Sequence, residues 1–252
     1  MTFQEYSAYY DLLYTDKKYE SEVDYVVRTL RSANPQTRTI LELGSGTGRH
    51  GRLLAGIGFA VHGVELSQDM ALVARSGAGK TPAGGRFDCD VGDLRLVRVG
   101  HTFDAVISLF HVISYQTTDD DLRAAFKTAA VHLEPGGIFL FDVWHGPAVL
   151  ATPPAIRTKE VANQHYRVKR VARPEHDASR ATVRVAYELD CEDLYTKQKT
   201  QFVEDHLMRY LFPTEVEAFA AEAGFTVRMT EEFLTGRAPS TETWGVGYLL
   251  QK

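Results

Sequence analysis

Apolar residues along this chain alternate between short continuous runs and spacings of three and four. The short runs are typical of strands that are buried on both faces of a parallel sheet. The segments between them have the spacing of amphipathic helices with one apolar face. This alternation predicts an α/β fold built on a mostly parallel sheet. The predicted strands are 39–43, 60–65, 87–90, 103–110 and 138–143, and the predicted helices are 21–32, 49–55, 67–75 and 119–133.

The pattern changes in the last third of the chain. From Trp144 to Phe212 prolines first cluster, and apolar residues then recur at every second position. Such alternation is typical of antiparallel strands with one buried face. The predicted elements of this part and of the C-terminal part are strands 165–172, 181–191 and 200–211, a hairpin loop at 174–179, a helix at 213–223, and a closing antiparallel pair of strands at 225–233 and 243–250.

These elements divide the chain into three parts. An N-terminal helical segment covers residues 1–37. The main α/β domain is formed by residues 38–144 and 213–252, and a β-rich insertion of residues 145–212 interrupts it. We expect the glycine-rich stretch 77–85 of the main domain to be a loop.

A strand, a glycine turn and a helix follow one another at residues 39–55. Gly44, Gly46 and Gly48 occupy every second position, where the absence of a Cβ atom permits a sharp turn and a close approach to a ligand. This order predicts a pocket for a nucleotide cofactor. The Gly-x-Gly-x-Gly spacing differs from the Gly-x-Gly-x-x-Gly pattern of dinucleotide sites. Glu42 precedes the first glycine and would repel a pyrophosphate, whereas it suits a cationic ligand with an ammonium or sulfonium group.

A second acid supports the cofactor pocket. Glu65 ends the strand 60–65, about 20 residues after the glycines, where a carboxylate commonly binds the two hydroxyls of a ribose. Ser67 follows as the expected N-cap of the next helix.

Composition narrows the function classes. The chain has 252 residues, 44% hydrophobic and 24% charged, with a net charge of -5. Without a basic run, nucleic-acid binding is not favoured. The N-terminus has no signal-peptide pattern, and no apolar run approaches the roughly 20 residues that span a bilayer. Cys89 and Cys191 lie far apart, which predicts buried free thiols in a reducing compartment. We expect a cytoplasmic protein.

The motif Glu42-Leu43-Gly44-Ser45-Gly46-Thr47-Gly48, with Gly92-Asp93-Leu94 further on, resembles class I S-adenosylmethionine (SAM) dependent methyltransferases. The resemblance implies a Rossmann-like, mostly parallel seven-stranded sheet whose last strand is antiparallel. It also implies SAM as the cofactor, with Asp93 and the next backbone N–H at the adenine edge and Met70 packed on the ring. The implied cofactor-binding residues are Tyr10, Glu42, Gly44, Ser45, Gly46, Gly48, Glu65, Leu66, Met70, Asp93, Leu94 and Leu109.

The rest of the chain resembles one group of these enzymes, the N,N-dimethyltransferases of nucleotide-linked amino sugars. The resemblance rests on the N-terminal tyrosines, the Phe-x-x-Ile-x-aromatic segment that begins at Phe110, the β-rich insertion, and the stretch 204–210. It implies an N-terminal lid over SAM and an insertion that covers the acceptor. Where that group tends to have Gly-His, this chain has Ser114-Tyr115, and a histidine stands instead at His111.

Four residues are candidates for orienting and deprotonating the acceptor: Tyr14, His111, Tyr115 and His206. His111 and Tyr115 follow the carboxyl end of a predicted parallel strand, where ligands bind in such sheets. A histidine suits proton removal near neutral pH, and a tyrosine suits orientation. The alternative is structural: His111 caps a helix or binds a carbonyl, and His206 faces solvent. No carboxylate cluster follows that strand, so we expect no metal.

The leading hypothesis is a SAM-dependent methyltransferase of a small molecule, with the amino group of a nucleotide-linked sugar as a candidate acceptor. An O-methyltransferase of another metabolite is the alternative within this class. A NAD(P)-binding Rossmann oxidoreductase and a non-catalytic SAM-binding module are the alternatives from other classes. The sequence leaves open the acceptor atom, the number of methyl groups added and the oligomeric state, a homodimer included.

Overall fold

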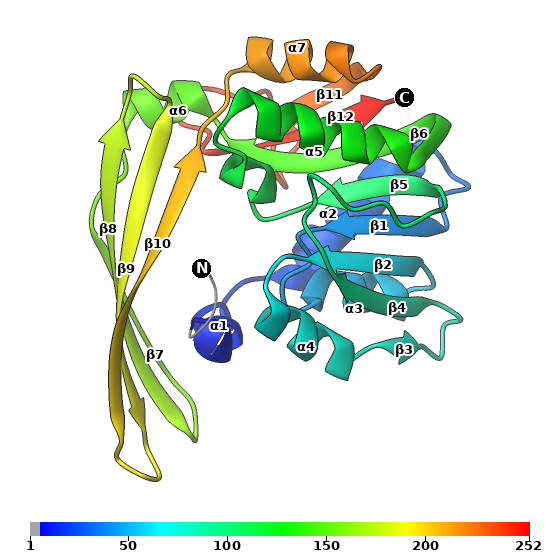
Figure 1. The fold of residues 1–252 in the computed structure, drawn as a ribbon. Helices are drawn as coiled ribbons and strands as arrows, with labels where there is room; N and C mark the ends of the chain where they lie inside the picture. The colour runs from blue at the N-terminus through cyan, green and yellow to red at the C-terminus, as the bar shows by residue number, and fades with distance from the viewer. Residues whose placement is uncertain (1–5) are drawn as a thin grey trace.

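The computed structural model describes residues 6–252 and contains two β-sheets, with helices packed around the larger one (Figure 1). The first five residues of the predicted lid lie outside the described part. The strands of the larger sheet are β1 (Thr39–Leu43), β2 (Ala60–Glu65), β3 (Gly79–Lys80), β4 (Arg86–Val91), β5 (Phe103–Ser108), β6 (Leu133–Trp144), β11 (Thr226–Glu232) and β12 (Gly245–Gln251).

The larger sheet is mostly parallel, as predicted. Its order is β11-β12-β6-β5-β1-β2-β4-β3, and the neighbours from β6 to β4 are parallel. The last strand, β12, runs antiparallel to both β6 and β11. The predicted count of seven strands is wrong, because the sheet has eight. The additional strand, β3, lies in the predicted loop 77–85 and pairs antiparallel with β4 over two residues, too few to leave a periodic pattern.

Helices cover both faces of the larger sheet. Alternate side chains of one strand enter different cores: Ile40 of β1 packs on one face, and Leu41 and Leu43 pack on the other. The core with Ile40 includes α2, α3 and α4, and the core with Leu41 includes α5 and α7. The helices are α1 (Ser7–Leu13), α2 (Tyr19–Ala33), α3 (Arg49–Gly56), α4 (Gln68–Ser76), α5 (Asp119–Val131), α6 (Gly146–Ala151) and α7 (Pro213–Glu222), with a short 3-10 helix, η1 (Val112–Tyr115).

The second sheet is antiparallel and stands beside the larger one, with α1 between the two (Figure 1). Its inner surface packs against α1 in a cluster that contains Leu12 and Leu13 of the helix and Val168 and Leu189 of the sheet. This packing holds the N-terminal helix against the sheet. The strands, in the order β10-β9-β8-β7, are β7 (Arg157–Ala162), β8 (Tyr166–Asp177), β9 (Thr182–Asp193) and β10 (Lys199–Arg209).

Several details of this second sheet differ from the prediction. The predicted hairpin loop 174–179 is mostly strand, because β8 continues to Asp177. Pro174 pairs with Val185 of β9 and lies beyond the last pair between β7 and β8. Its missing N–H therefore costs no hydrogen bond to β7. The strand β7 was not predicted, because it is a largely exposed edge strand rich in charged residues. The short helix α6 was also not predicted.

Two boundaries near the centre of the larger sheet also differ. The predicted strand 103–110 ends at Ser108, and the chain then turns through left-handed conformations at Phe110 and His111. The predicted helix 119–133 ends at Val131, and Leu133 already belongs to β6. Because β5 ends at Ser108, residues 109–111 leave the sheet.

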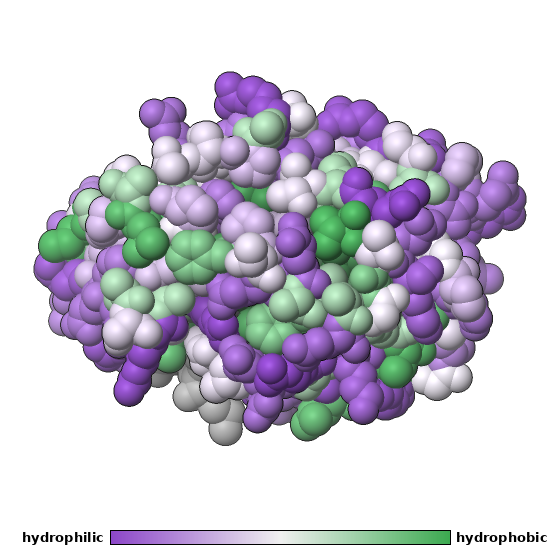
Figure 2. Space-filling view, turned by 90° about the horizontal axis from the view of Figure 1, so that it is seen from above, coloured by the Kyte–Doolittle hydropathy of each residue, from purple (hydrophilic) through white to green (hydrophobic). Residues whose placement is uncertain are grey.

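The outer surface is mixed in character. Figure 2 shows separate hydrophobic patches bordered by hydrophilic residues on the face seen from above. Isolated apolar residues of this kind are ordinary on a folded protein. Within residues 6–252, no helix has the length and apolar character needed to cross a membrane. Cys89 and Cys191 are buried, as predicted, and form no disulfide within the described residues.

Candidate functional site

The glycine turn after β1 has the geometry that its sequence predicts. Gly44, Gly46 and Gly48 have φ values of 76°, 56° and 77°, which favour glycine over any residue with a side chain. A Cβ atom on Gly44 would lie 2.4 Å from Val112 Cγ1, and one on Gly48 would lie 2.7 Å from Phe87 Cζ. The turn therefore needs glycine both for its conformation and for the space around it.

Glu65, at the end of β2, holds this turn in place. Its Oε2 accepts a hydrogen bond of 2.8 Å from the backbone N–H of Gly46, and its Oε1 accepts one of 2.8 Å from that of Ser67. Burial raises the pKa of Glu65, and these backbone donors oppose that effect. Ser67 caps α4 as predicted, since its Oγ accepts from the N–H of Met70. The carboxylate thus joins the glycine turn to the next loop.

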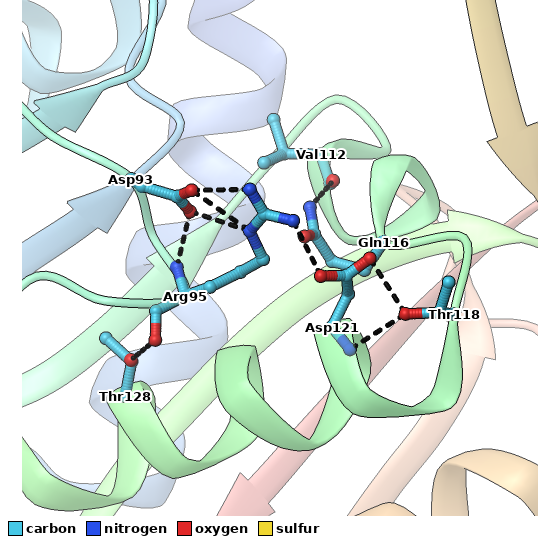
Figure 3. A network of polar contacts seen from close by, with 7 residues as sticks. All are labelled: Asp93, Arg95, Val112, Gln116, Thr118, Asp121 and Thr128. Carbon is cyan, nitrogen blue, oxygen red and sulfur yellow. Dashed lines mark hydrogen bonds and ion pairs between the residues drawn. The ribbon is translucent and has the colours of Figure 1, made fainter.

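Asp93 follows β4 and is part of a polar network that also contains Arg95 and Asp121 (Figure 3). Both oxygens of Asp93 accept hydrogen bonds from the Arg95 guanidinium, at 2.6–3.0 Å. Arg95 Nη1 also donates to Asp121 at the start of α5, at 2.6 Å. The hydrogen bonds from Arg95 hold the pKa of Asp93 below its usual value. Arg95 was not predicted, although it stands only two residues after Asp93.

Glu42 lies behind the glycine turn and does not face the cavity. It is 1% exposed, and its Oε1 lies 3.9 Å from Nδ1 of His50, whose Nε2 lies 2.7 Å from Glu22. Burial and then the charge of Glu65 raise the pKa of Glu42 to about 8. The expectation that this carboxylate meets a cationic ligand directly does not fit this placement. Burial on β1 leaves it within a layer of polar groups behind the turn.

A single cavity of about 1130 Å³ joins the glycine turn, the carboxyl ends of the parallel strands, the helix α1 and the inner face of the second sheet. Glu42 and Gly48 are the predicted site residues outside its lining. The predicted residues that line it are Tyr10, Tyr14, Gly44, Ser45, Gly46, Glu65, Leu66, Met70, Asp93, Leu94, Leu109, His111, Tyr115 and His206.

Tyr115 and His206 form a hydrogen-bonded pair in this cavity. Tyr115 ends η1, His206 lies on β10, and the phenol oxygen is 2.8 Å from Nδ1. Burial and then the charge of Arg170 lower the pKa of His206 to about 4. Burial also raises the pKa of Tyr115 well above its ordinary value. Burial therefore favours the neutral form of both side chains.

Arg170, on β8, connects the second sheet to the N-terminal helix and was not predicted. Its Nη1 donates to the hydroxyl oxygens of Tyr6 and Tyr14, at 3.0 and 3.1 Å. Its guanidinium also lies 4.6 Å from the ring centre of Tyr187. A cation over an aromatic face is stabilised by the charge distribution of the ring. Arg170 thereby fixes the position of Tyr14 at the edge of the cavity.

His111 occupies a different electrostatic environment from His206. Its Nδ1 lies 2.7 Å from Oδ2 of Asp142, and its backbone N–H donates to the same oxygen at 3.2 Å. Asp142 is 1% exposed and comes from β6. Although burial raises the pKa of this carboxyl, His111 brings it below the ordinary value. The sequence placed His111 after β5 but gave no sign of this partner.

No group of three or more histidine, cysteine or acidic side chains within residues 6–252 is arranged to hold a metal ion. The expectation of a metal-independent site stays a prediction.

Comparison with known proteins places the chain among methyl-transferring enzymes. A family model described as a methyltransferase domain matches residues 40–137. The dTDP-3-amino-3,4,6-trideoxy-alpha-D-glucopyranose N,N-dimethyltransferase of Streptomyces venezuelae is 29% identical over 230 residues, which are 90% of this chain and 93% of that protein.

Solved structures agree with this similarity. The crystal structure of Streptomyces venezuelae DesVI has a TM-score of 0.79 and 26% identity, over 96% of this chain and 97% of that one. CalS10, an amino pentose methyltransferase from Micromonospora echinaspora in a SAM-bound structure, has a TM-score of 0.73 and 26% identity, over 100% of this chain and 98% of that one. The fold is thus shared along nearly the whole chain.

The buried Glu42 leads to a prediction about stability. Its pKa of about 8 in the folded chain lies above the ordinary 4.5, so the folded state keeps a proton that the unfolded state loses. The stability that comes from this proton is complete below about pH 4.5 and is lost as the pH rises toward about 8. We expect Glu42→Gln to gain in unfolding temperature relative to the wild type as the pH increases from about 5 to about 8.

Thermal unfolding of both proteins without cofactor, at several pH values, measures this difference. Glu175→Gln is a control, because Glu175 is an acid on the second sheet, paired with Arg184 at the surface. A difference between wild type and Glu42→Gln that does not change with pH would contradict the prediction.

Proposed function

We propose that this chain, which belongs to the class I SAM-dependent methyltransferases, methylates the amino group of a nucleotide-linked sugar. The observation that carries the proposal is the single cavity, which brings the predicted cofactor loops and the predicted acceptor groups together. The similarity of the whole chain to a sugar N,N-dimethyltransferase supports the choice of acceptor.

The residues around the glycine turn fit SAM. The turn borders the cavity with Gly44 and Gly46, which have no Cβ atoms, and Glu65 presents a carboxylate beside it that suits a ribose diol. Met70 and Leu94 line the cavity near Asp93 and would enclose the adenine. When bound, SAM supplies an activated methyl group on a positively charged sulfur. The protein then has to hold the acceptor nitrogen in line and free its lone pair.

The four acceptor-side residues divide into two groups by environment. Tyr14, held by Arg170, and Tyr115, held by His206, are assigned to orienting the acceptor through their hydroxyl groups. His206 is assigned to positioning Tyr115, since burial and Arg170 lower its pKa to about 4. His111 remains as the group that takes the proton of the acceptor, because a carboxylate supports its ring. The lid and the second sheet would cover the acceptor from the remaining sides.

The test of the proposal is methyl transfer from isotopically labelled SAM to a panel of acceptors. The panel contains nucleotide-linked amino sugars, the matching free amino sugars, and analogues with a hydroxyl in place of the amine. We expect labelled product from the nucleotide-linked amines and little from the others. Dialysis against EDTA should leave the rate unchanged. Transfer to the hydroxyl analogues alone would favour an O-methyltransferase, and no transfer to any acceptor would favour a binding module.

Cofactor binding tests the assignment of Glu65. Glu65→Ala removes a carboxylate that faces the cavity and also leaves the N–H groups of Gly46 and Ser67 without their acceptor. We expect calorimetry to show a loss of roughly 1–3 kcal/mol in the affinity for S-adenosylhomocysteine. Glu175→Ala is the control and should bind normally. An unchanged affinity of Glu65→Ala would refute this role, and tight binding of NADH with none of SAM would refute the cofactor assignment.

The pair of Tyr115 and His206 gives a prediction about coupling. If His206 acts only through its hydrogen bond to Tyr115, then Tyr115→Phe and His206→Ala should each reduce kcat/KM by the equivalent of about 0.5–1.5 kcal/mol. The double variant should have a kcat/KM only slightly below that of the less active single variant. Tyr195→Phe is a control, because Tyr195 is 91% exposed. Additive losses would show that the two residues act independently.

A further inference from the structure

Asp142 is a buried carboxylate whose side chain is directed at one functional residue. Its Oδ2 lies 2.7 Å from His111 Nδ1 and accepts the backbone N–H of His111 at 3.2 Å. No hydrogen bond from residues 6–252 reaches its other oxygen, Oδ1. A buried carboxylate is costly unless a partner compensates its charge. His111 is that partner, through both its ring and its backbone.

The backbone at this point is held in an unusual conformation. Phe110 and His111 have φ values of 64° and 61°, so two successive residues with side chains occupy the left-handed region. Such conformations persist only where the surroundings impose them, and they concentrate at functional sites. Here the Phe110 ring packs edge-on against Tyr14 at 5.1 Å, and Asp142 binds the backbone of His111. Both contacts hold the ring of His111 at the wall of the cavity.

The orientation of the His111 ring separates its two nitrogens. Nδ1 is buried and faces Asp142, whereas the side chain as a whole is 23% exposed and lines the cavity. Nε2 is therefore the nitrogen that is available to a bound acceptor. In a neutral imidazole one nitrogen carries the proton, and a carboxylate beside Nδ1 selects the Nδ1–H form. That form leaves the lone pair of Nε2 for the cavity.

The other charged groups near this pair agree with an ionised Asp142. Burial raises its pKa, but His111 and then Lys17, in the segment between α1 and α2, together bring it below the ordinary value. Tyr25 on α2 is another titratable group that interacts electrostatically with Asp142, and burial is the main cause of its raised pKa. A buried anion next to an imidazole stabilises the protonated ring.

We propose that Asp142 is the positioning residue for His111, and that it fixes the ring so that Nε2 accepts the proton of the acceptor ammonium group. In this step the N–H bond of the ammonium breaks, an Nε2–H bond forms, and the nitrogen of the acceptor keeps the electron pair as its free lone pair. The proton later leaves to solvent. An aliphatic amine is mostly protonated near pH 7, so this step has to precede its methylation. The inference rests on the proposed function, because it concerns an amine acceptor.

The experiment compares Asp142→Asn with the wild type in two measurements. In the first, ¹⁵N NMR reports which ring nitrogen of His111 carries the proton in the neutral form, in the protein without cofactor. We expect the Nδ1–H form in the wild type and a larger share of the Nε2–H form when the charge of Asp142 is removed. In the second, we expect kcat to fall about 10²-fold or more.

Asp104→Asn is the matched control. Asp104 accepts backbone hydrogen bonds of 2.8 Å from Arg38 and Thr39 at the opposite end of the sheet. Its loss should reduce stability without changing the ring tautomer of His111. Binding of S-adenosylhomocysteine and the unfolding temperature of each variant show whether it has folded.

A second background distinguishes positioning from a merely structural role. In His111→Gln, a further Asp142→Asn change should reduce kcat by less than twofold, because Asp142 has no ring left to position. A full 10²-fold loss in that background would overturn the proposal, as would an unchanged ring tautomer of His111 in Asp142→Asn. The tautomer measurement needs no acceptor. If no acceptor is methylated but the tautomer changes, the proposed function fails while the coupling of Asp142 and His111 stands.

Discussion

The part of the cavity proposed to bind the cofactor depends on the hydrogen bonds that the Glu65 carboxylate accepts. This carboxylate accepts the backbone N–H groups of Gly46 and Ser67, and so fixes the glycine turn relative to the start of α4. Parallel pairing of β1 and β2 brings these two loops to the same edge of the sheet. Because three residues of the turn are glycines in left-handed conformations, its backbone has little stiffness of its own. The hydrogen bonds to Glu65, at the end of the neighbouring strand, hold it in one conformation.

The acceptor side is assembled in a different way, from elements that lie far apart in the sequence. The inner face of the second sheet packs against α1, and Arg170 adds two hydrogen bonds to tyrosines of that segment. Tyr115 from the main domain meets His206 from β10 in the same region. The walls of the acceptor end are therefore held to one another by polar contacts as well as by apolar packing. A small shift of the second sheet would therefore displace both Tyr14 and Tyr115.

The sequence predicted well what depends on local pattern. The strand, turn and helix around Gly44, the cap at Ser67 and the alternation in β9 each follow from neighbouring residues. Edge strands such as β7 were missed because they are polar on both faces. Partners such as Asp142 could not be predicted, because their importance comes from a contact between residues 31 positions apart. Glu42 has a residue type that suits a cation, but only the fold shows that it is buried behind the turn.

The two candidate histidines show why residue type is insufficient to assign a role. His206 lies among tyrosines and near Arg170, and burial and this cation favour its neutral form, although Glu204 Oε1 lies 3.7 Å from its Nε2. His111 has an anion at its inner nitrogen and the cavity at its outer side. The same side chain is thus set to hold a phenol in one place and is supported for receiving a proton in the other. Both environments depend on the positions of β6 and β8 in the fold. The strand β6 supplies the carboxylate of Asp142, and β8 supplies the guanidinium of Arg170.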